Sequence, residues 1–239
     1  LASTMSPDDL PIYFGQEAIT CLFRQLELDA DEEGVVLWSE VLHVLVVRMS
    51  TNGIGGSFST EALERSSLEL GAQAMRSYRC AHVLATAIQK MAAVDLTVYC
   101  SRGVVERMAE QVSAAGMRGD LCIQGLSLLV EKLAARELAA CFSPDVVAHI
   151  VAQIGSEAGG DGEDVAMAAA SLAGDLVVDA MGAYVDQASI GHAVGLLGRL
   201  HGRGNACADV VRKLVEKLPN NALIACFPLK IVSELGRLT

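Results

Sequence analysis

The sequence predicts an all-α protein built from a repeated unit of about 42 residues, and three observations lead to this prediction. Of its 239 residues, 52% are hydrophobic but only 4% are aromatic, a composition that favours close-packed helices over strands. Most of the phenylalanines fall in one column at steps of 42 to 44 residues. Apolar residues recur behind each member of that column at helical spacing. The column, called here the first column, consists of Phe14, Phe58, Cys100, Phe142, Val185 and Phe227.

The first column marks the start of one helix in every unit. The stretches FGQEAI, FSTEAL, CSRGVV, FSPDVV, VDQASI and FPLKIV align as six versions of the same start. Five residues further on, the aligned position is Ile19, Leu63, Val105, Val147, Ile190 and Val232. Twelve residues further on, it is Leu26, Leu70, Val112, Ile154 and Leu197. Because seven residues make two helical turns, both positions are predicted to lie on one buried face.

A second long helix is expected in every unit, with its register given by a second column, Trp38, Cys80, Cys122, Val165 and Cys207. Its buried stripe follows the second column by three, seven and eleven residues, the pattern of an amphipathic helix. This stripe comprises Gly125, Leu129 and Leu133, then Ala168, Leu172 and Leu176, then Val210, Leu214 and Leu218. Short apolar segments such as RELAACF and NNALIACF predict a third, shorter helix, which the stretch STNGIGGS at 50–57 is expected to replace.

Two longer helices and a short one at this period resemble the armadillo repeat family, with HEAT-like repeats as a close alternative around residues 50–57. The resemblance covers nearly the whole chain and rests on two stretches, GVVERMAEQVSAAGMRGDLCIQGLSLLVEKLA and PDVVAHIVAQIGSEAGGDGEDVAMAAASLAGDLV. It implies a right-handed α-solenoid of about five repeats whose second long helices line a concave groove that binds other proteins. We expect one domain over 1–239, with units at about 14–57, 58–99, 100–141, 142–184 and 185–226 and the start of a sixth at 227–239.

The groove is expected to be lined by positions five and nine after the second column. These positions are His43 and Val47, Ala85 and Gln89, Ser127 and Glu131, Ala170 and Gly174, and Arg212 and Glu216. The residues expected to contact a partner are His43, Gln89, Ser127, Glu131, Arg212 and Glu216. The Trp and Asn residues that recur along this face in nuclear-import adaptors of the armadillo family do not recur here. The small residues at Ala85, Ser127, Ala170 and Gly174 leave room for a bulky ligand, such as a helix laid into the groove.

An alternative function comes from the stretch LELDADEEGVVLWSE, which matches most of the calcium-loop pattern. The ligands would be Asp29, Asp31, Glu33 and Glu40, with Gly34 at the turn. Glu33 is longer than the usual ligand at its place, and no second loop of this kind follows. The repeat explains the same stretch as a turn between two helices, without a bound metal. A protein without a metal is therefore the first hypothesis, and a calcium-responsive regulator is the second.

Catalysis and nucleic-acid binding have little support in the sequence. The histidines form no metalloprotease motif, and no nucleophile motif accompanies them, so we expect neither an enzyme nor a cofactor. A net charge of −11 disfavours phosphate binding and leaves open a basic partner. No uninterrupted apolar run reaches the length of a membrane span. Seven cysteines without a C-x-x-C motif indicate free thiols in the cytoplasm or another reducing compartment.

The sequence therefore predicts a non-catalytic scaffold or adaptor that binds a peptide, a helix or a subunit through the concave groove. Because the sixth unit stops at Thr239 without its second long helix, we expect further chain, a neighbouring subunit or a second copy to cover its apolar end. The protein is thus expected to act within a larger complex or a longer chain.

Overall fold

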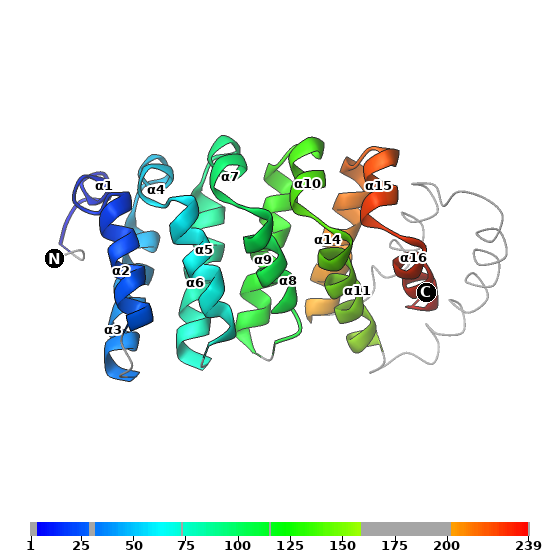
Figure 1. Cartoon of the computed structure of the whole chain (residues 1–239), viewed down its shortest axis with the longest axis horizontal. Helices are drawn as coiled ribbons and strands as arrows, with labels where there is room; N and C mark the ends of the chain where they lie inside the picture. Colours follow the sequence, from blue (N-terminus) through cyan, green and yellow to red (C-terminus); the bar gives the residue numbers. More distant parts are fainter. Residues whose placement is uncertain (1–3, 29–31, 73, 115, 159–201, 239) are drawn as a thin grey trace. The chain divides into compact units, whose positions relative to one another are not determined.

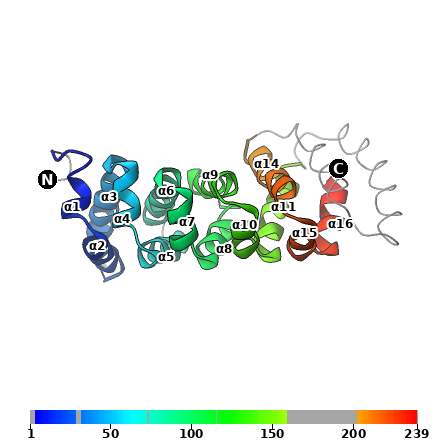
Figure 2. The ribbon, with the colours of Figure 1, turned by 90° about the horizontal axis from the view of Figure 1, so that it is seen from above.

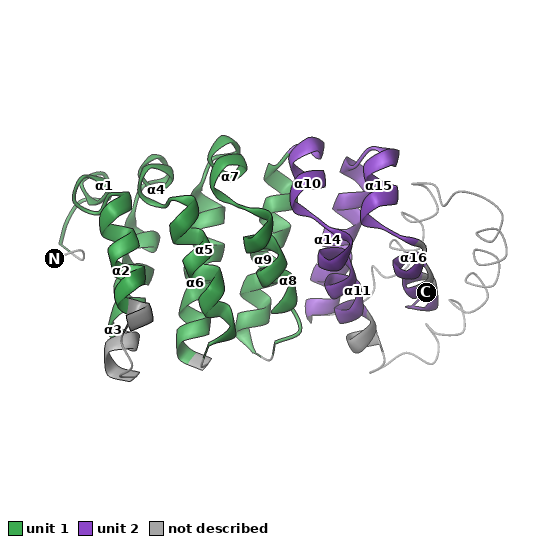
Figure 3. Cartoon of the chain, in the orientation of Figure 1, with its two compact units in different colours: residues 1–133 green, residues 134–239 purple. Residues whose placement is uncertain are grey.

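The structure is a computed structural model that describes residues 4–28, 32–72, 74–114, 116–158 and 202–238, and all its regular elements in these ranges are helices (Figure 1). They are α1 (Leu10–Tyr13), α2 (Gln16–Leu28), α3 (Glu32–Arg48), α4 (Thr51–Ser57), α5 (Thr60–Leu68), η1 (Glu69–Gly71), α6 (Ala74–Lys90), α7 (Ala93–Tyr99), α8 (Arg102–Glu110), α9 (Met117–Lys132), α10 (Ala135–Cys141), α11 (Pro144–Ala158), α14 (Gly202–Lys217), α15 (Asn220–Cys226) and α16 (Leu229–Leu238). The predicted all-α class is confirmed for the described part. The chain divides into two compact units, Leu1–Leu133 and Ala134–Thr239 (Figure 3).

The first unit contains two layers of long helices. Helices α2, α5 and α8 pack on one another in one layer, and α3, α6 and α9 pack on one another in the other (Figure 2). Each helix of the first layer also packs on the helix of the second layer that follows it in the chain. The short helices α1, α4 and α7 lie together at one end of the long helices (Figure 1). The predicted repeats at 14–57 and 58–99 therefore each contribute one helix to each layer and one short helix, α4 or α7, to the end, whereas α1 precedes the first predicted repeat.

The first column marks the end of each short helix. Phe58, Cys100, Phe142 and Phe227 follow α4, α7, α10 and α15 directly, and all four side chains are buried. Their backbone N–H groups close the last turn of the preceding helix through bonds of 2.7–3.0 Å to the carbonyls of Ile54, Leu96, Leu138 and Leu223. These residues then leave the helical conformation and turn the chain into the next long helix. The side chain therefore enters the core at the corner between two helices.

The predicted buried positions after the first column are confirmed in the repeats at 14–57, 58–99, 100–141 and 142–184 where their side chains are described, but not in the segment at 227–239. Five residues after the first column, the described side chains of the first four repeats are 0% exposed: Ile19, Leu63, Val105 and Val147. Twelve residues after it, the exposed fraction is at most 1% at Leu70, Val112 and Ile154. Val232 is half-buried. Ile190 and Leu197 lie outside the described residues, and the side chain of Leu26 is also outside the description.

The stripe on the second long helices is also confirmed where it is described. Cys80, Cys122, Gly125, Leu129, Leu133, Cys207, Val210, Leu214 and Leu218 are buried. Trp38, the first member of the second column, is only half-buried. Val165, Ala168, Leu172 and Leu176 lie outside the described residues.

The expectation that residues 50–57 lack a short helix is wrong, because Thr51–Ser57 forms α4. Its glycines permit close packing of short helices. A Cβ at Gly53 would overlap the ring of Pro11 on α1, and a Cβ at Gly55 would overlap the carboxylate of Asp95 on α7. Burial of Ile54 in the middle of α4 stabilises the helix against the poor helix propensity of its glycines. Helix propensity predicts an irregular segment here, whereas packing against the neighbouring short helices favours a helix.

Lysines at the ends of α6 and α9 bind each repeat of the first unit to the repeat before it. The ammonium of Lys90 donates to the carbonyls of Val47 and Met49, the latter at 2.8 Å. The ammonium of Lys132 donates to the carbonyls of Ile88, Gln89 and Met91, the first at 2.9 Å and the last at 2.8 Å. The last carbonyls of a helix have no partner within the helix and bear partial negative charge. Each lysine therefore satisfies the open end of the helix one repeat earlier.

The second unit is built around α11. This helix packs on α14, α15 and α16, and it buries Val147, Ile150, Val151 and Ile154. The thiol of Cys226 at the end of α15 donates to the carbonyl of Phe142, at a distance of 3.0 Å. Residues 159–201, which contain most of the predicted repeat at 142–184 and part of that at 185–226, lie outside the description, so the single array over 1–239 stays a prediction.

Candidate functional site

The outer face of α3, α6 and α9 in the first unit repeats in register from one helix to the next. Its residues stand two, six and nine positions after Trp38, Cys80 and Cys122, and all are exposed or half-exposed. This surface, called here the second-helix face, consists of Glu40, Val44 and Val47 on α3, His82, Thr86 and Gln89 on α6, and Gln124, Leu128 and Glu131 on α9. It is the surface that corresponds most closely to the predicted groove.

The structure places only part of the predicted groove on this face. Gln89 and Glu131, at position nine, are exposed, whereas His43 and Ser127, at position five, are half-buried. The prediction that Ala85 lines the groove is wrong, because this side chain is only 3% exposed and its Cα lies against Gly125 of α9. Ala85 therefore points toward α9, where its small size permits close helix packing and leaves no floor for a ligand.

Sequence reasoning missed four polar or aromatic residues of this region, Tyr78, His82, Thr86 and Gln124. His82, Thr86 and Gln89 follow the spacing i, i+4, i+7, which is that of one helical face. Counting backward from Gln89 by three residues instead of four would have selected Thr86 in place of Ala85. The spacing of apolar residues on the opposite side was a sufficient signal for this choice.

A polar cluster joins α3 to α6 on the second-helix face. The guanidinium of Arg79 forms an ion pair with Glu40 and donates a hydrogen bond to Nδ1 of His43, at 3.0 Å. A guanidinium has no acceptor, so Nδ1 of His43 accepts and the proton of the neutral ring is on Nε2. The Thr86 hydroxyl is hydrogen bonded to Nδ1 of His82, at 3.2 Å. The positions of both imidazoles are therefore fixed by neighbouring side chains.

The rings in this cluster are in contact with one another. His43 and His82 meet edge to face, with ring centroids 4.3 Å apart, and Tyr78 lies edge to face with His82 at 6.3 Å. Burial lowers the pKa of His43, and the neighbouring His82 and Arg79 lower it further. Burial also lowers the pKa of His82. Both rings are consequently neutral at pH 7, and this part of the face presents aromatic and hydrogen-bonding groups with one compensated ion pair.

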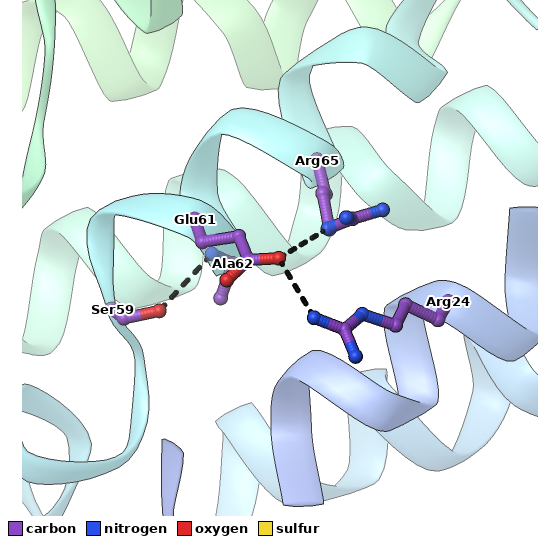
Figure 4. Close-up of polar contacts among 5 residues, drawn as sticks. All are labelled: Arg24, Ser59, Glu61, Ala62 and Arg65. Atoms are coloured by element: carbon purple, nitrogen blue, oxygen red, sulfur yellow. Dashed lines mark hydrogen bonds and ion pairs between the residues drawn. The ribbon is translucent and has the colours of Figure 1, made fainter. Parts of the chain in front are cut away.

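The first layer has an exposed ion-pair cluster of a different kind (Figure 4). Glu61 on α5 accepts a hydrogen bond of 3.0 Å from Arg65 on the same helix and one of 3.5 Å from Arg24 on α2. The hydrogen bond from Arg65 is the main cause that lowers the pKa of Glu61. Ser59 caps α5 by accepting a hydrogen bond from the N–H of Ala62. Exposed ion pairs contribute little free energy, so this cluster adds little to the stability of the first layer.

The stretch that matched a calcium loop is helical where it is described. Helix α3 begins at Glu32, so Glu33 lies in its first turn and Glu40 two turns later, whereas Asp29 and Asp31 lie outside the described residues. Glu40 is paired with Arg79. In a calcium loop the chain wraps around the ion before the second helix starts. Within the described ranges, no three His, Cys, Asp or Glu side chains are arranged to hold a metal ion.

In the second unit, the predicted residues Arg212 and Glu216 are exposed on α14 and bind each other at 2.9 Å. Arg212 also pairs with Asp209, and Lys213 pairs with the same carboxylate at 2.8 Å. Burial by itself would raise the pKa of Asp209, but hydrogen bonds from Lys213 and Arg212 together lower it. These charges are therefore compensated along one helix. Ala170 and Gly174 lie outside the described residues.

Comparison of the chain with family models, curated proteins and solved structures finds no match. In the described part of the chain, no single helix is long and apolar enough to cross a membrane. Helix α10 and residues 144–154 of α11 reach the required length and composition only when counted together, and they are bent by 85° at the break between them.

Proposed function

We propose that this chain is a non-catalytic scaffold of armadillo-like repeats that binds another protein through the second-helix face. The observation that supports the proposal best is the repetition of exposed positions in the same register on α3, α6 and α9. Adjacent packed helices lie about 8–10 Å apart, so equivalent side chains recur at that interval across the layer. A row of this kind offers repeated contacts to a peptide or a helix that crosses several repeats.

The side chains of the face favour a protein partner over a small-molecule substrate. Val44, Val47 and Leu128 provide apolar contact, and Gln89 and Gln124 provide hydrogen-bond donors and acceptors. The neutral His43–His82 pair adds aromatic surface at the centre of the layer. Protein interfaces combine apolar and aromatic contacts with polar groups in this way. The overall charge of −11 favours partners with Lys or Arg near the contact.

Site-specific photo-crosslinking in cells tests the proposal. A photoreactive phenylalanine analogue at Gln124 should give a discrete protein adduct, whereas the same analogue at Glu110, exposed on α8 of the other layer, should not. In a second experiment the photoreactive analogue is placed at Thr86. The substitutions Gln89→Arg and Gln124→Arg, which place bulky cations on the face, should then abolish the adduct. Equal capture from both layers, or capture that resists the double substitution in a folded protein, would contradict the proposal.

A further inference from the structure

The end of the first unit formed by α1, α4 and α7 exposes four large apolar side chains. Ile12 and Tyr13 of α1 are 75% and 69% exposed, and Val94 and Val98 of α7 are 69% and 62% exposed. Val94 and Val98 stand one turn apart on the side of α7 opposite the buried Leu96. We call the surface made by α1, α4 and α7 the short-helix edge. It lies at the end of the long helices and is separate from the second-helix face (Figure 1).

Helix α4 lies between α1 and α7 on this edge. The ring of Pro11 on α1 lies where a Cβ at Gly53 would be, and the carboxylate of Asp95 on α7 lies where a Cβ at Gly55 would be. The view from above shows the three short helices in one row (Figure 2). The exposed side chains of α1 and α7 therefore flank α4 in one continuous surface.

Gly56 on α4 has no packing role within the described part of the chain. Unlike Gly53 and Gly55, it is exposed, and nothing lies within 4 Å of the place where its Cβ would be. Its φ is negative, so any residue could adopt its conformation. Glycine is a poor helix former, and its usual roles are an unusual backbone conformation or the close approach of another group. With the first role excluded, Gly56 leaves room on the surface of α4 for another molecule to approach closely.

The segments that form the edge have acidic residues but no basic ones. Residues 1–23, 49–64 and 91–101 contain no Lys or Arg. Asp8 and Asp9, next to α1, are exposed, and Asp95 on α7 is half-buried. The edge therefore combines apolar side chains with carboxylates, and no cation of its own segments compensates them.

Arg48 and Lys90, which directly precede residues 49–64 and 91–101, are directed to backbone carbonyls. Arg48 donates to the carbonyl of Met5 at 2.8 Å, and Lys90 donates to that of Met49 at 2.8 Å. Their charges thus compensate the ends of peptide segments and helices. The segments of the edge itself therefore contribute only negative charge, from their carboxylates.

We propose that the short-helix edge binds an apolar segment of a partner protein that bears Lys or Arg beside its apolar side chains. The apolar side chains of the partner cover Ile12, Tyr13, Val94 and Val98, and its backbone or a bulky side chain approaches α4 at Gly56. Carboxylates at the edge attract the basic residues of the partner and repel anionic lipid headgroups. They also disfavour a second copy of this chain, whose net charge is −11.

The test uses a synthetic helical peptide of leucine and lysine, with leucine on one face, and measures its affinity by fluorescence anisotropy. The variant Val94→Asn with Val98→Asn should weaken binding by about tenfold or more without lowering the melting temperature. Gly56→Ala should raise the melting temperature, because alanine is the better helix former, and should weaken binding at the same time. The matched control is Leu68→Asn, which replaces an exposed leucine of α5 outside both proposed binding surfaces and should leave affinity unchanged.

Each result decides the proposal. Opposite changes in stability and affinity for Gly56→Ala support close approach at this glycine, whereas unchanged affinity overturns it. Equal affinity of the double asparagine variant and the native protein, or absence of binding to the native protein, overturns the edge as a site.

A peptide with glutamate in place of lysine should not bind, and binding of it would overturn the charge argument. Binding to phosphatidylserine vesicles that the same variants abolish would replace the protein partner with a lipid surface. Because Gln89→Arg and Gln124→Arg lie on the other face, their effects separate this inference from the proposed scaffold function.

Discussion

Replacing Gly125 with leucine tests how closely α9 packs on its neighbours. A Cβ at Gly125 would overlap the terminal methyl of Met108 on α8 and would lie 3.5 Å from Cδ1 of Ile88 and 3.8 Å from the Cα of Ala85, both on α6. Met108 is flexible and can move away from one added carbon. The backbone of α6 at Ala85 cannot move without shifting the whole helix, so a leucine side chain must separate the two helices.

The magnitude follows from two opposing effects. Alanine in place of glycine favours a helix by about 1 kcal/mol, which offsets the displacement of the Met108 methyl, so Gly125→Ala should change the free energy of unfolding by less than about 1 kcal/mol. Leucine gains the same propensity but overfills the site, and overpacking costs about 1–3 kcal/mol. Gly125→Leu should therefore be less stable than Gly125→Ala by about 1–3 kcal/mol.

Urea unfolding followed by circular dichroism at the helix band measures both free energies. Gly56→Leu is the matched control, because Gly56 is exposed and nothing lies within 4 Å of the place where its Cβ would be, so leucine there should not destabilise the protein. If Gly125→Leu is as stable as Gly125→Ala, the close contact between α9 and α6 is not present in solution. A loss of stability in Gly56→Leu equal to that in Gly125→Leu would show that leucine itself, and not the packing, is responsible.

Three further predictions concern single side chains of the first unit. Lys132→Met should lower the free energy of unfolding by about 1 kcal/mol in urea titrations, because hydrogen bonds from an ammonium to the end of α6 are lost, and an unchanged midpoint would contradict this role. Burial lowers the pKa of His43 and His82 below 6.5, so the unfolded chain takes up protons before the folded protein does, and stability should fall as the pH falls below 6.5. The melting temperature of His82→Gln should depend less on pH in this range. A pH dependence equal to that of the native protein would refute the lowered pKa of His82. Burial raises the pKa of the Cys80 thiol to about 12. An aromatic disulfide reagent should therefore modify the exposed Cys21 in the native protein but Cys80 only after unfolding. Reaction of the Cys80 thiol before unfolding would contradict its burial.

Periodicity in the sequence predicted the buried faces because each of them repeats the same contact. Ile19, Leu63 and Val105 occupy equivalent places in successive repeats and are all fully buried. A column of this kind averages out local irregularities, so its register is reliable from sequence. The same argument failed at Trp38, which belongs to the first repeat of its column and is half-buried.

The exposed face was harder to predict because the buried arc of a helix is wider than the single column that marks it, and the centre of that arc can lie away from the column. A helix turns by about 100° per residue, so positions five and nine lie about 140° and 180° from the second column. The buried arc of α6 includes Ala81, Leu84, Ala85 and Ile88 as well as Cys80, since this helix packs on α3, α5 and α9. Its centre is displaced from Cys80, and the exposed side moves with it to His82 and Thr86. The second column alone does not show this displacement, whereas the full set of apolar residues on α6 does.

The short helix α4 shows a second limit of sequence reasoning. Its three glycines predicted an irregular segment, because propensity is the local property that a sequence displays. Two of them are required by the neighbours Pro11 and Asp95, which lie far away in the sequence. Only the arrangement of the repeats shows that glycine permits this helix to fit.

The lysine contacts described above connect positions 41 to 44 residues apart, which is the length of one repeat. Each donor therefore needs only the helix end that precedes it, and each repeat presents a new helix end to a following donor. A tandem duplication of one whole repeat within the first unit would preserve every such pair, so the gene can lengthen by complete repeats without creating an unsatisfied helix end. Insertion of a single residue inside α9 would rotate Lys132 by about 100° relative to the preceding part of the helix and would remove it from its carbonyls. We therefore expect changes in chain length within the first unit to be tolerated as multiples of one repeat, and smaller insertions to be tolerated only in the loops between helices.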